Sequence, residues 1–228
     1  MLFLRSLIKM KHLSYFLISL FFIGSALAQG PVSGNDPKAT QILKDVSAKY
    51  KKFKSIRANF AYTLESKANK VKETHKGILH LKGERFKVEI QGQEIICDGK
   101  TSWNYNKDAN EVQVNTYNPA DGQLSPSQLF TMYEKGFLYK FIDEKNVKGK
   151  MIQQIELTPT DKNKKYFKVK LFVDKNAKQL VKSSIFDKNG NVYTYEITKF
   201  ETDVKYDDAY FTFDLKSHPK CEVIDLRD

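Results

Sequence analysis

The chain has 228 residues, a formal net charge of +11 and 41% hydrophobic residues, which is enough for one large domain with a packed core. No linker or repeat divides it, and no nucleic-acid-binding module accompanies the basic charge, so a multidomain protein and a nucleic-acid-binding protein are both disfavoured. The aromatic share of 13% favours a β-rich fold.

The N-terminus has the features of a secretory signal peptide. Three basic residues precede a short apolar run (13–23) and a small-x-small motif that ends at Ala28. The run is shorter than the ~20 residues that span a bilayer, so a membrane anchor is the weaker interpretation. We predict a signal peptide over residues 1–28, cleaved after Ala28, and one domain over residues 29–228. Cleavage lowers the net charge to +8.

An amphipathic helix is predicted next, with Asp36 as its cap and Pro37 at its first position. Apolar residues recur at helical spacing up to Phe53. This helix either packs on a sheet or covers an opening.

From Ile56 the period changes to two, which predicts strands. The alternating apolar residues are Phe60, Tyr62 and Leu64, then Leu79 and Leu81, then Phe86, Val88 and Ile90, then Trp103 and Tyr105, and then Val112 and Val114. Each set shares one face of its strand. The segment 77–118 is therefore predicted to be an antiparallel meander with one apolar, aromatic face.

A short helix is predicted to begin at Ser125 and end at Gly136. Its apolar residues Leu129, Phe130 and Met132 spread over more than one face, so the helix is either well buried or covers a ligand. Strands return from Phe137, for a total of about ten or eleven strands and two or three helices in one curved sheet. Cys97 and Cys221 are not expected to form a disulfide.

Catalytic and metal-binding motifs are not recognisable. No histidine has a Cys, His or carboxylate at metal-ligand spacing, and there is no nucleophile elbow or phosphate-binding glycine loop. The prediction is a protein without metal or cofactor that is not an enzyme. The alternative is an enzyme whose catalytic pair is distant in sequence, since such a pair leaves no local motif.

The segment 98–105, Asp-Gly-Lys-Thr-Ser-Trp-Asn-Tyr, is similar to a motif of the periplasmic outer-membrane lipoprotein carrier family of Gram-negative bacteria. Shorter similarities follow in the family's order: Ser-Pro at 125–126 with Leu-Phe at 129–130, Leu-Thr-Pro at 157–159, and Phe-Thr-Phe at 211–213. The resemblance covers nearly the whole chain after the leader. It implies a mainly β fold, an incomplete antiparallel β-barrel with a helical lid over an apolar cavity.

The resemblance further implies a monomeric periplasmic carrier of lipoprotein acyl chains. Its partners would be an inner-membrane lipoprotein-releasing transporter and an outer-membrane receptor or the outer membrane itself. The expected cavity and lid residues are Phe60, Tyr62, Leu64, Leu79, Leu81, Phe86, Val88, Ile90, Trp103, Val112, Val114, Leu129, Phe130 and Met132. For each of these, and most of all for Trp103, ordinary core packing is the alternative.

The family's Arg-Pro pair before the aromatic residue at the cavity mouth is absent here, and Lys82 or Arg85 could take the place of its lid-locking arginine. Two other functions stay open at this point. One is a related periplasmic module that binds lipids or senses lipoproteins, and the other is an exported lipid-processing enzyme.

Overall fold

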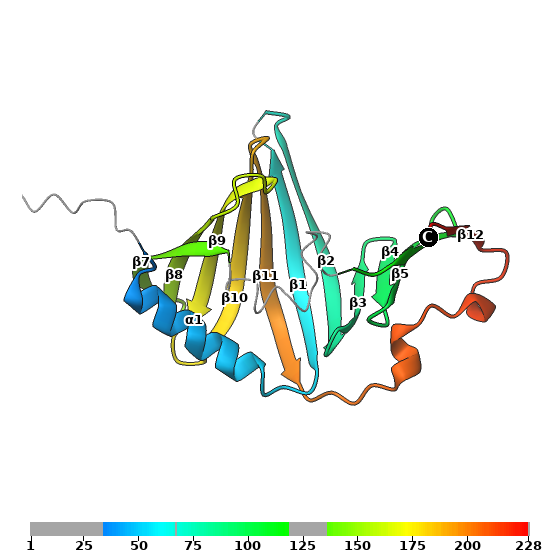
Figure 1. Ribbon diagram of the computed structural model, residues 1–228, viewed down its shortest axis with the longest axis horizontal. Coiled ribbons are helices and arrows are strands. Elements are labelled where there is room, and N and C mark those ends of the chain that lie inside the picture. The colour runs from blue at the N-terminus through cyan, green and yellow to red at the C-terminus, as the bar shows by residue number, and fades with distance from the viewer. Residues whose placement is uncertain (1–33, 67, 119–135, 228) are drawn as a thin grey trace, which may run out of the picture. The chain divides into compact units, whose positions relative to one another are not determined.

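The computed structural model describes residues 34–66, 68–118 and 136–227, which belong to one compact unit (Figure 1). The predicted leader and the predicted helix that begins at Ser125 lie outside these residues, as do Leu129, Phe130 and Met132. The described chain is mainly β and contains one α-helix and two short 3-10 helices.

Twelve strands of the described chain form one sheet. They are β1 (Ile56–Ser66), β2 (Val71–Lys82), β3 (Arg85–Ile90), β4 (Gln93–Cys97), β5 (Thr101–Asn106), β6 (Glu111–Thr116), β7 (Phe137–Val147), β8 (Lys150–Pro159), β9 (Tyr166–Asp174), β10 (Gln179–Asp187), β11 (Asn191–Thr202) and β12 (Glu222–Asp225). Their order is β12-β6-β5-β4-β3-β2-β1-β11-β10-β9-β8-β7. Every pairing is antiparallel except that of β12 with β6.

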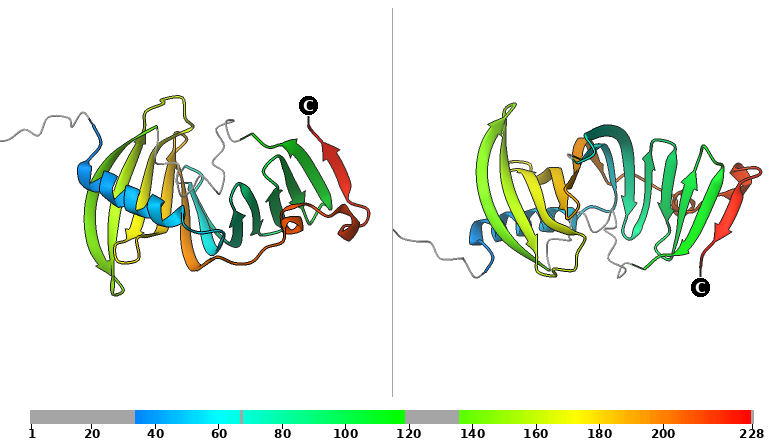
Figure 2. Two further views of the ribbon diagram at one scale, coloured as in Figure 1. Left: turned by 60° about the horizontal axis from the view of Figure 1, so that its bottom comes forward. Right: turned by 90° about the horizontal axis from the view of Figure 1, so that it is seen from above.

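The edge strands β7 and β12 do not pair with each other in the described chain, so the sheet stays open. This confirms the predicted incomplete antiparallel barrel, and it adds a short parallel strand at the C-terminal edge that the sequence pattern did not predict. Figure 2 shows the strong curvature of the sheet from two further directions.

Helix α1 (Pro37–Tyr50) begins where predicted. The carboxylate of Asp36 accepts hydrogen bonds from the backbone N–H groups of Lys38 and Ala39, at 2.8 and 3.2 Å. The same residue also bonds to edge strand β7, since its N–H donates to the carbonyl oxygen of Tyr139 at 3.0 Å and its carboxylate accepts from the N–H of Phe141 at 3.1 Å. The start of the helix therefore satisfies backbone groups that an exposed edge strand would leave open.

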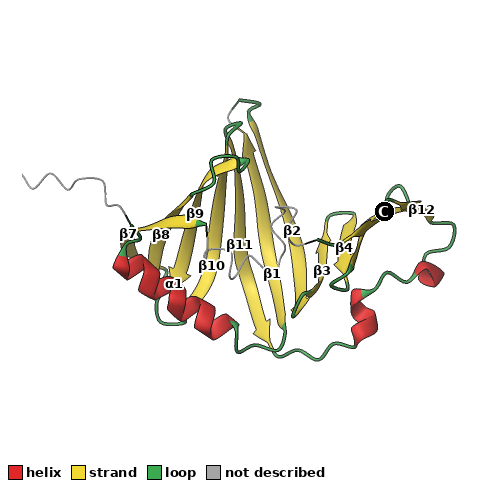
Figure 3. Cartoon of the chain, viewed as in Figure 1, coloured by secondary structure: helices red, strands yellow, loops and turns green. Residues whose placement is uncertain are grey.

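We call the face of the sheet that α1 covers the inner face (Figure 3). Buried α1 residues such as Leu43 and Val46 share one core cluster with Ile155, Leu157 and Leu171 of β8 and β9. The predicted helix thus packs on the sheet, as one of the two interpretations expected.

The outer face of β4–β6 is covered by a different element, the C-terminal segment 203–221. It contains the 3-10 helices η3 (Asp208–Phe211) and η4 (Leu215–Ser217) before the chain adds β12 next to β6. A second apolar cluster forms here from Ile96, Tyr105, Val112 and Phe213. In this part of the sheet the outer face therefore has its own buried apolar cluster, whereas β4 alone contributes to the inner-face cluster, through Cys97 and Ile95.

The two cysteines are both free. Cys97 is fully buried in the inner-face cluster, whereas Cys221 packs against the outer-face cluster.

Candidate functional site

The inner face beyond α1 carries a row of half-buried apolar side chains, which we call the apolar strip. Its members are Phe60, Tyr62 and Leu64 of β1, Val88 and Ile90 of β3, Ile95 of β4, Ile185 of β10, and Tyr193, Tyr195 and Ile197 of β11. The strand register places them together, since Phe60 pairs with Ile197 and Val88 pairs with Ile95. No acidic or basic residue belongs to this strip.

Four aromatic rings form one end of the apolar strip. The Tyr62 ring centroid lies 5.1 Å from that of Tyr195 and 6.4 Å from that of Tyr193, and the Phe60 ring lies 6.3 Å from Tyr195. Burial raises the pKa of Tyr195 to about 12 and also raises the pKa of Tyr62. These hydroxyls stay protonated at neutral pH, so the four rings carry no charge. His75 and Glu73 of β2 lie beside this end, since they pair with Tyr62 and Leu64, and the His75 ring stacks on Tyr62 with the centroids 6.4 Å apart.

Gly77 of β2 makes room for the Phe60 ring within the strip. A Cβ atom at this position would lie 2.5 Å from Cζ of Phe60 and 2.7 Å from the carbonyl oxygen of Glu89. Both distances are too short for a real side chain, so only glycine permits this close approach. The Phe60 ring therefore takes the place of a β2 side chain on the inner face.

The predicted cavity residues divide between the two faces. Phe60, Tyr62, Leu64, Val88 and Ile90 lie in the apolar strip. Leu79, Leu81 and Phe86 share the inner face but are buried in the core cluster, at 5%, 7% and 5% exposure.

Trp103, Val112 and Val114 lie on the outer face, which corrects their assignment to one cavity with Phe86. Trp103 pairs with Ile96 and with Val114, and Val112 is in the cluster under the C-terminal segment. Phe86 and Trp103 lie on opposite faces because their partners in β4 are consecutive residues. Phe86 pairs with Cys97 and Trp103 pairs with Ile96, and neighbouring side chains of a strand point to opposite faces. Plain core packing, the alternative favoured for Trp103, describes all three residues.

Lys82 and Arg85 also lie on the outer face. The ammonium of Lys82 donates to the carbonyl oxygen of Tyr206 and to the Asp208 carboxylate, both at 3.0 Å, and Arg85 forms an ion pair with the same carboxylate. These contacts attach η3 to the β2–β3 hairpin. Both side chains alternate with the inner-face residues Leu81 and Phe86, and their predicted role in locking a lid stays a prediction, because the predicted lid helix lies outside the described residues.

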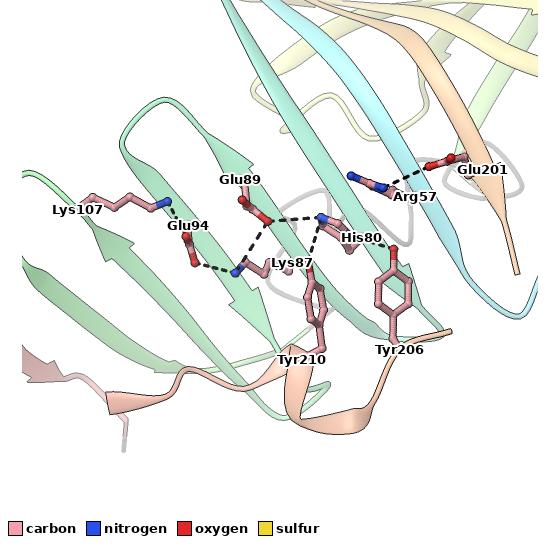
Figure 4. Close-up of polar contacts among 9 residues, drawn as sticks. All are labelled: Arg57, His80, Lys87, Glu89, Glu94, Lys107, Glu201, Tyr206 and Tyr210. Atoms are coloured by element: carbon pink, nitrogen blue, oxygen red, sulfur yellow. Dashed lines mark hydrogen bonds and ion pairs between the residues drawn. The ribbon is translucent and has the colours of Figure 1, made fainter. Parts of the chain in front are cut away.

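A buried histidine lies at the centre of this attachment (Figure 4). His80 of β2 is 5% exposed, and its Nδ1 and Nε2 lie 2.9 Å and 3.2 Å from the hydroxyls of Tyr206 and Tyr210. An oxygen of Glu89 lies 3.4 Å from Nε2. Sequence motifs did not reveal this site, because the two tyrosines follow His80 by more than 120 positions.

Charged residues extend the polar contacts along β3–β5. Lys87 lies 3.9 Å from Glu89 and 2.9 Å from Glu94, and Lys107 lies 2.6 Å from Glu94. Burial by itself would raise the pKa of Glu94, but the hydrogen bonds from Lys107 and Lys87 lower it below its ordinary value. The charges near His80 are therefore largely compensated within the outer face.

The stability of this attachment is expected to depend on pH. Burial lowers the pKa of His80 below 6.5, and Arg57 and Lys87 lower it further, while Glu89 opposes them. Below pH 6.5 the unfolded chain therefore binds more protons at this position than the folded chain does, and the free energy of unfolding falls as the pH falls. Denaturant unfolding between pH 8 and pH 5 measures this effect.

A His80→Gln variant is the control for that pH series, since glutamine keeps polar atoms but does not titrate. The wild type should lose more stability than the variant between pH 7 and pH 5. Parallel pH profiles of the two proteins would show that His80 does not contribute.

Two pockets border α1 and the outer face. One of about 480 Å³ lies beside α1 and is lined by Thr40, Lys44, Ser47, Lys51 and neighbouring residues. Another of about 590 Å³ lies where β1–β3 bend on the outer face, with charged side chains Lys76, Glu89 and Lys107 in its lining. The lining of the second pocket also includes Phe60 and Ile90 of the apolar strip.

Within residues 34–66, 68–118 and 136–227, no three His, Cys, Asp or Glu side chains gather where they could hold a metal ion. In the same ranges, no helix has the length and apolar character needed to cross a membrane.

A family model described as outer membrane lipoprotein carrier protein LolA matches residues 51–214. An uncharacterized protein of Methanocaldococcus jannaschii, MJ0687, is 27% identical over 201 residues, which cover 85% of this chain but only 56% of that protein.

A solved structure with a TM-score above 0.5 shares the fold at low sequence identity. An uncharacterized conserved protein from Thermus thermophilus superposes with a TM-score of 0.53 at 13% identity, over 82% of this chain and 99% of that chain. The LolA superfamily protein NE2245 from Nitrosomonas europaea gives a TM-score of 0.40 at 16% identity, over 78% and 98% of the two chains.

Proposed function

Since the chain belongs to the outer membrane lipoprotein carrier protein LolA family, we propose that it is a periplasmic carrier that shields lipoprotein acyl chains between the inner and outer membranes. In this proposal an inner-membrane lipoprotein-releasing transporter loads the protein, and an outer-membrane receptor or the membrane itself unloads it. The protein acts as a monomer and catalyses no reaction.

The apolar strip is the observation that supports this proposal most directly. It presents half-buried aromatic and aliphatic side chains from five strands, and His75 and Glu73 of β2 lie beside it only at the Tyr62–Leu64 end. The transfer of each methylene group out of water is favourable by about 0.8 kcal/mol, so exposing whole acyl chains to water is very unfavourable. Acyl chains therefore need an apolar protein surface to cross an aqueous compartment. A site without fixed polar contacts also permits release, because few specific bonds have to break.

The co-purifying ligand is the direct test. The mature protein is purified from its own periplasm and examined by native mass spectrometry, followed by organic extraction and lipid analysis. Bound lipoprotein is the expected result. Phospholipid alone would replace the proposal with a lipid-binding module, and a protein that is empty and fails to take up a synthetic lipopeptide would contradict acyl-chain binding altogether.

A further inference from the structure

Lysines gather at one end of the sheet, where β8 turns into β9 and β10 turns into β11 (upper end in Figure 1). We call these two turns, with the start of β9, the turn end; its lysines are Lys162, Lys164, Lys165, Lys168, Lys170 and Lys188. The backbone N–H of Lys188 donates to the carbonyl oxygen of Lys165 at 3.0 Å. The turns are therefore hydrogen-bonded to each other, and their lysines lie close together.

The acidic groups at the turn end already have partners. The Asp187 carboxylate accepts hydrogen bonds from the Asn189 and Asn191 backbones, the Asn191 side chain and the Tyr193 hydroxyl, at 2.7 to 3.2 Å. Glu156 lies 3.6 Å from Lys168, and Asp161 accepts from the N–H of Asn163 at 2.8 Å. Six lysines face three engaged carboxylates, so the surface has a net positive charge.

Aromatic side chains lie among these lysines on the outer face. Phe167 is 48% exposed. The ammonium of Lys168 lies 5.7 Å and 5.5 Å from the ring centroids of Phe167 and Phe186, and that of Lys170 lies 5.6 Å from Phe186. An exposed ring beside several ammonium groups suits a membrane surface, because the ring can enter the acyl-chain layer while the ammonium groups contact the headgroups. An acidic protein partner would attract the lysines but would offer no apolar layer for the ring.

A pocket of about 530 Å³ opens at the same end. Lys164, Lys165 and Lys188 lie in its lining together with the apolar-strip residues Ile185 and Tyr193. The apolar strip therefore reaches the lysines of the turn end, and the pocket, which Asp187 also lines, places apolar and basic groups side by side.

We propose that the turn end docks on an anionic lipid bilayer through its lysines and Phe167. The docking itself stands on the charge and aromatic contacts of this surface. Its consequence, that the apolar strip meets the membrane end-on for transfer of acyl chains, rests on the proposed carrier function.

Vesicle flotation tests the docking. The mature protein should bind vesicles of phosphatidylcholine mixed with phosphatidylglycerol, should not bind phosphatidylcholine alone, and should detach in about 1 M salt, where the Debye length is about 3 Å. Each lysine near an anionic surface contributes about five-fold in affinity, so a Lys164→Glu/Lys165→Glu/Lys188→Glu variant should bind at least about 100-fold more weakly. Equal binding to both kinds of vesicle would overturn the proposal.

A matched control separates this surface from net charge. A Lys205→Glu/Lys216→Glu/Lys220→Glu variant makes the same charge change at exposed positions of the C-terminal segment, and it should retain vesicle binding to within about five-fold. An equal loss in both variants would show general charge attraction and overturn the docking. Displacement from vesicles by soluble glycerol phosphate would likewise overturn it, since that result indicates a headgroup pocket and not a membrane surface.

Uptake of a synthetic lipopeptide is measured in the same proteins. A wild type that takes up lipopeptide but does not float with anionic vesicles contradicts the docking and leaves the carrier function standing. A wild type that floats but takes up no lipopeptide supports the docking and contradicts the carrier function. A Lys164→Gln/Lys165→Gln/Lys188→Gln variant repeats the comparison if the glutamate variant does not fold, and it should also bind more weakly than wild type.

Discussion

An Ile197→Glu variant is expected to bind a synthetic lipopeptide at least about 100-fold more weakly than the wild type. Ile197 is half buried in the apolar strip, opposite Phe60. A carboxylate at this place must either be desolvated against the acyl chain or hold the chain away, and either costs about 3 kcal/mol or more. Equilibrium titration with a fluorescent lipopeptide measures the change.

The neighbouring residue provides the matched control. Thr198 is exposed and its hydroxyl bonds to the carbonyl oxygen of Asn59, so Thr198→Glu places the same carboxylate on the same strand but away from the strip. It should leave lipopeptide affinity within about two-fold, as is usual for surface changes. Equal affinities of wild type and Ile197→Glu would show that acyl chains do not contact the apolar strip.

A folding defect is distinguished from a binding defect by a second substitution. Ile90 belongs to the apolar strip but lies outside the inner-face core cluster, so Ile90→Glu should disturb the fold less than Ile197→Glu does. Thermal unfolding of each variant is recorded beside its affinity. Weak binding by a variant with native unfolding behaviour is the expected result.

A Phe211→Ala variant is expected to lower the free energy of unfolding by about 3–5 kcal/mol. Phe211 is fully buried, although it lies in the short 3-10 helix η3. Its ring centroid lies 5.4 Å from that of Tyr206 and 5.5 Å from that of Tyr210, the two tyrosines that contact His80. Loss of the ring leaves a cavity next to the buried His80 contacts, and denaturant unfolding measures the cost.

Leu215 in η4 provides the comparison for Phe211. It is 50% exposed, so Leu215→Ala should change the free energy of unfolding by less than about 0.5 kcal/mol. If Phe211→Ala were as stable as Leu215→Ala, the C-terminal segment would be a loosely attached tail and not an integral layer of the fold.

Local sequence patterns were sufficient to predict the class of the fold and the start of its helix. Strict alternation along β1 and β11 places Phe60 and Ile197 on a strand face without any knowledge of the partners, because successive side chains of a strand point to opposite faces. Asp36 followed by Pro37 likewise sets the first turn of α1 through local backbone chemistry alone. Such features depend on residues only a few positions apart.

The pairing of faces between strands became visible only in the folded chain. The residues Ile95, Ile96 and Cys97 of β4 are all apolar, so the sequence pattern does not show which of them lie on which face. In the structure Trp103 pairs with Ile96 on the outer face, and Phe86 pairs with Cys97 on the inner face. Alternation assigns faces within one strand, whereas the relation between strands requires the register.

The roles of Lys82, Arg85 and His80 were hidden from the sequence for a related reason. Their partners Tyr206, Asp208 and Tyr210 lie more than 120 positions further along the chain, and no local motif links the two segments. The C-terminal segment is held on the outer face because Phe213 buries the apolar side chains of β4–β6. This packing also places Tyr206, Asp208 and Tyr210 next to β2 and β3.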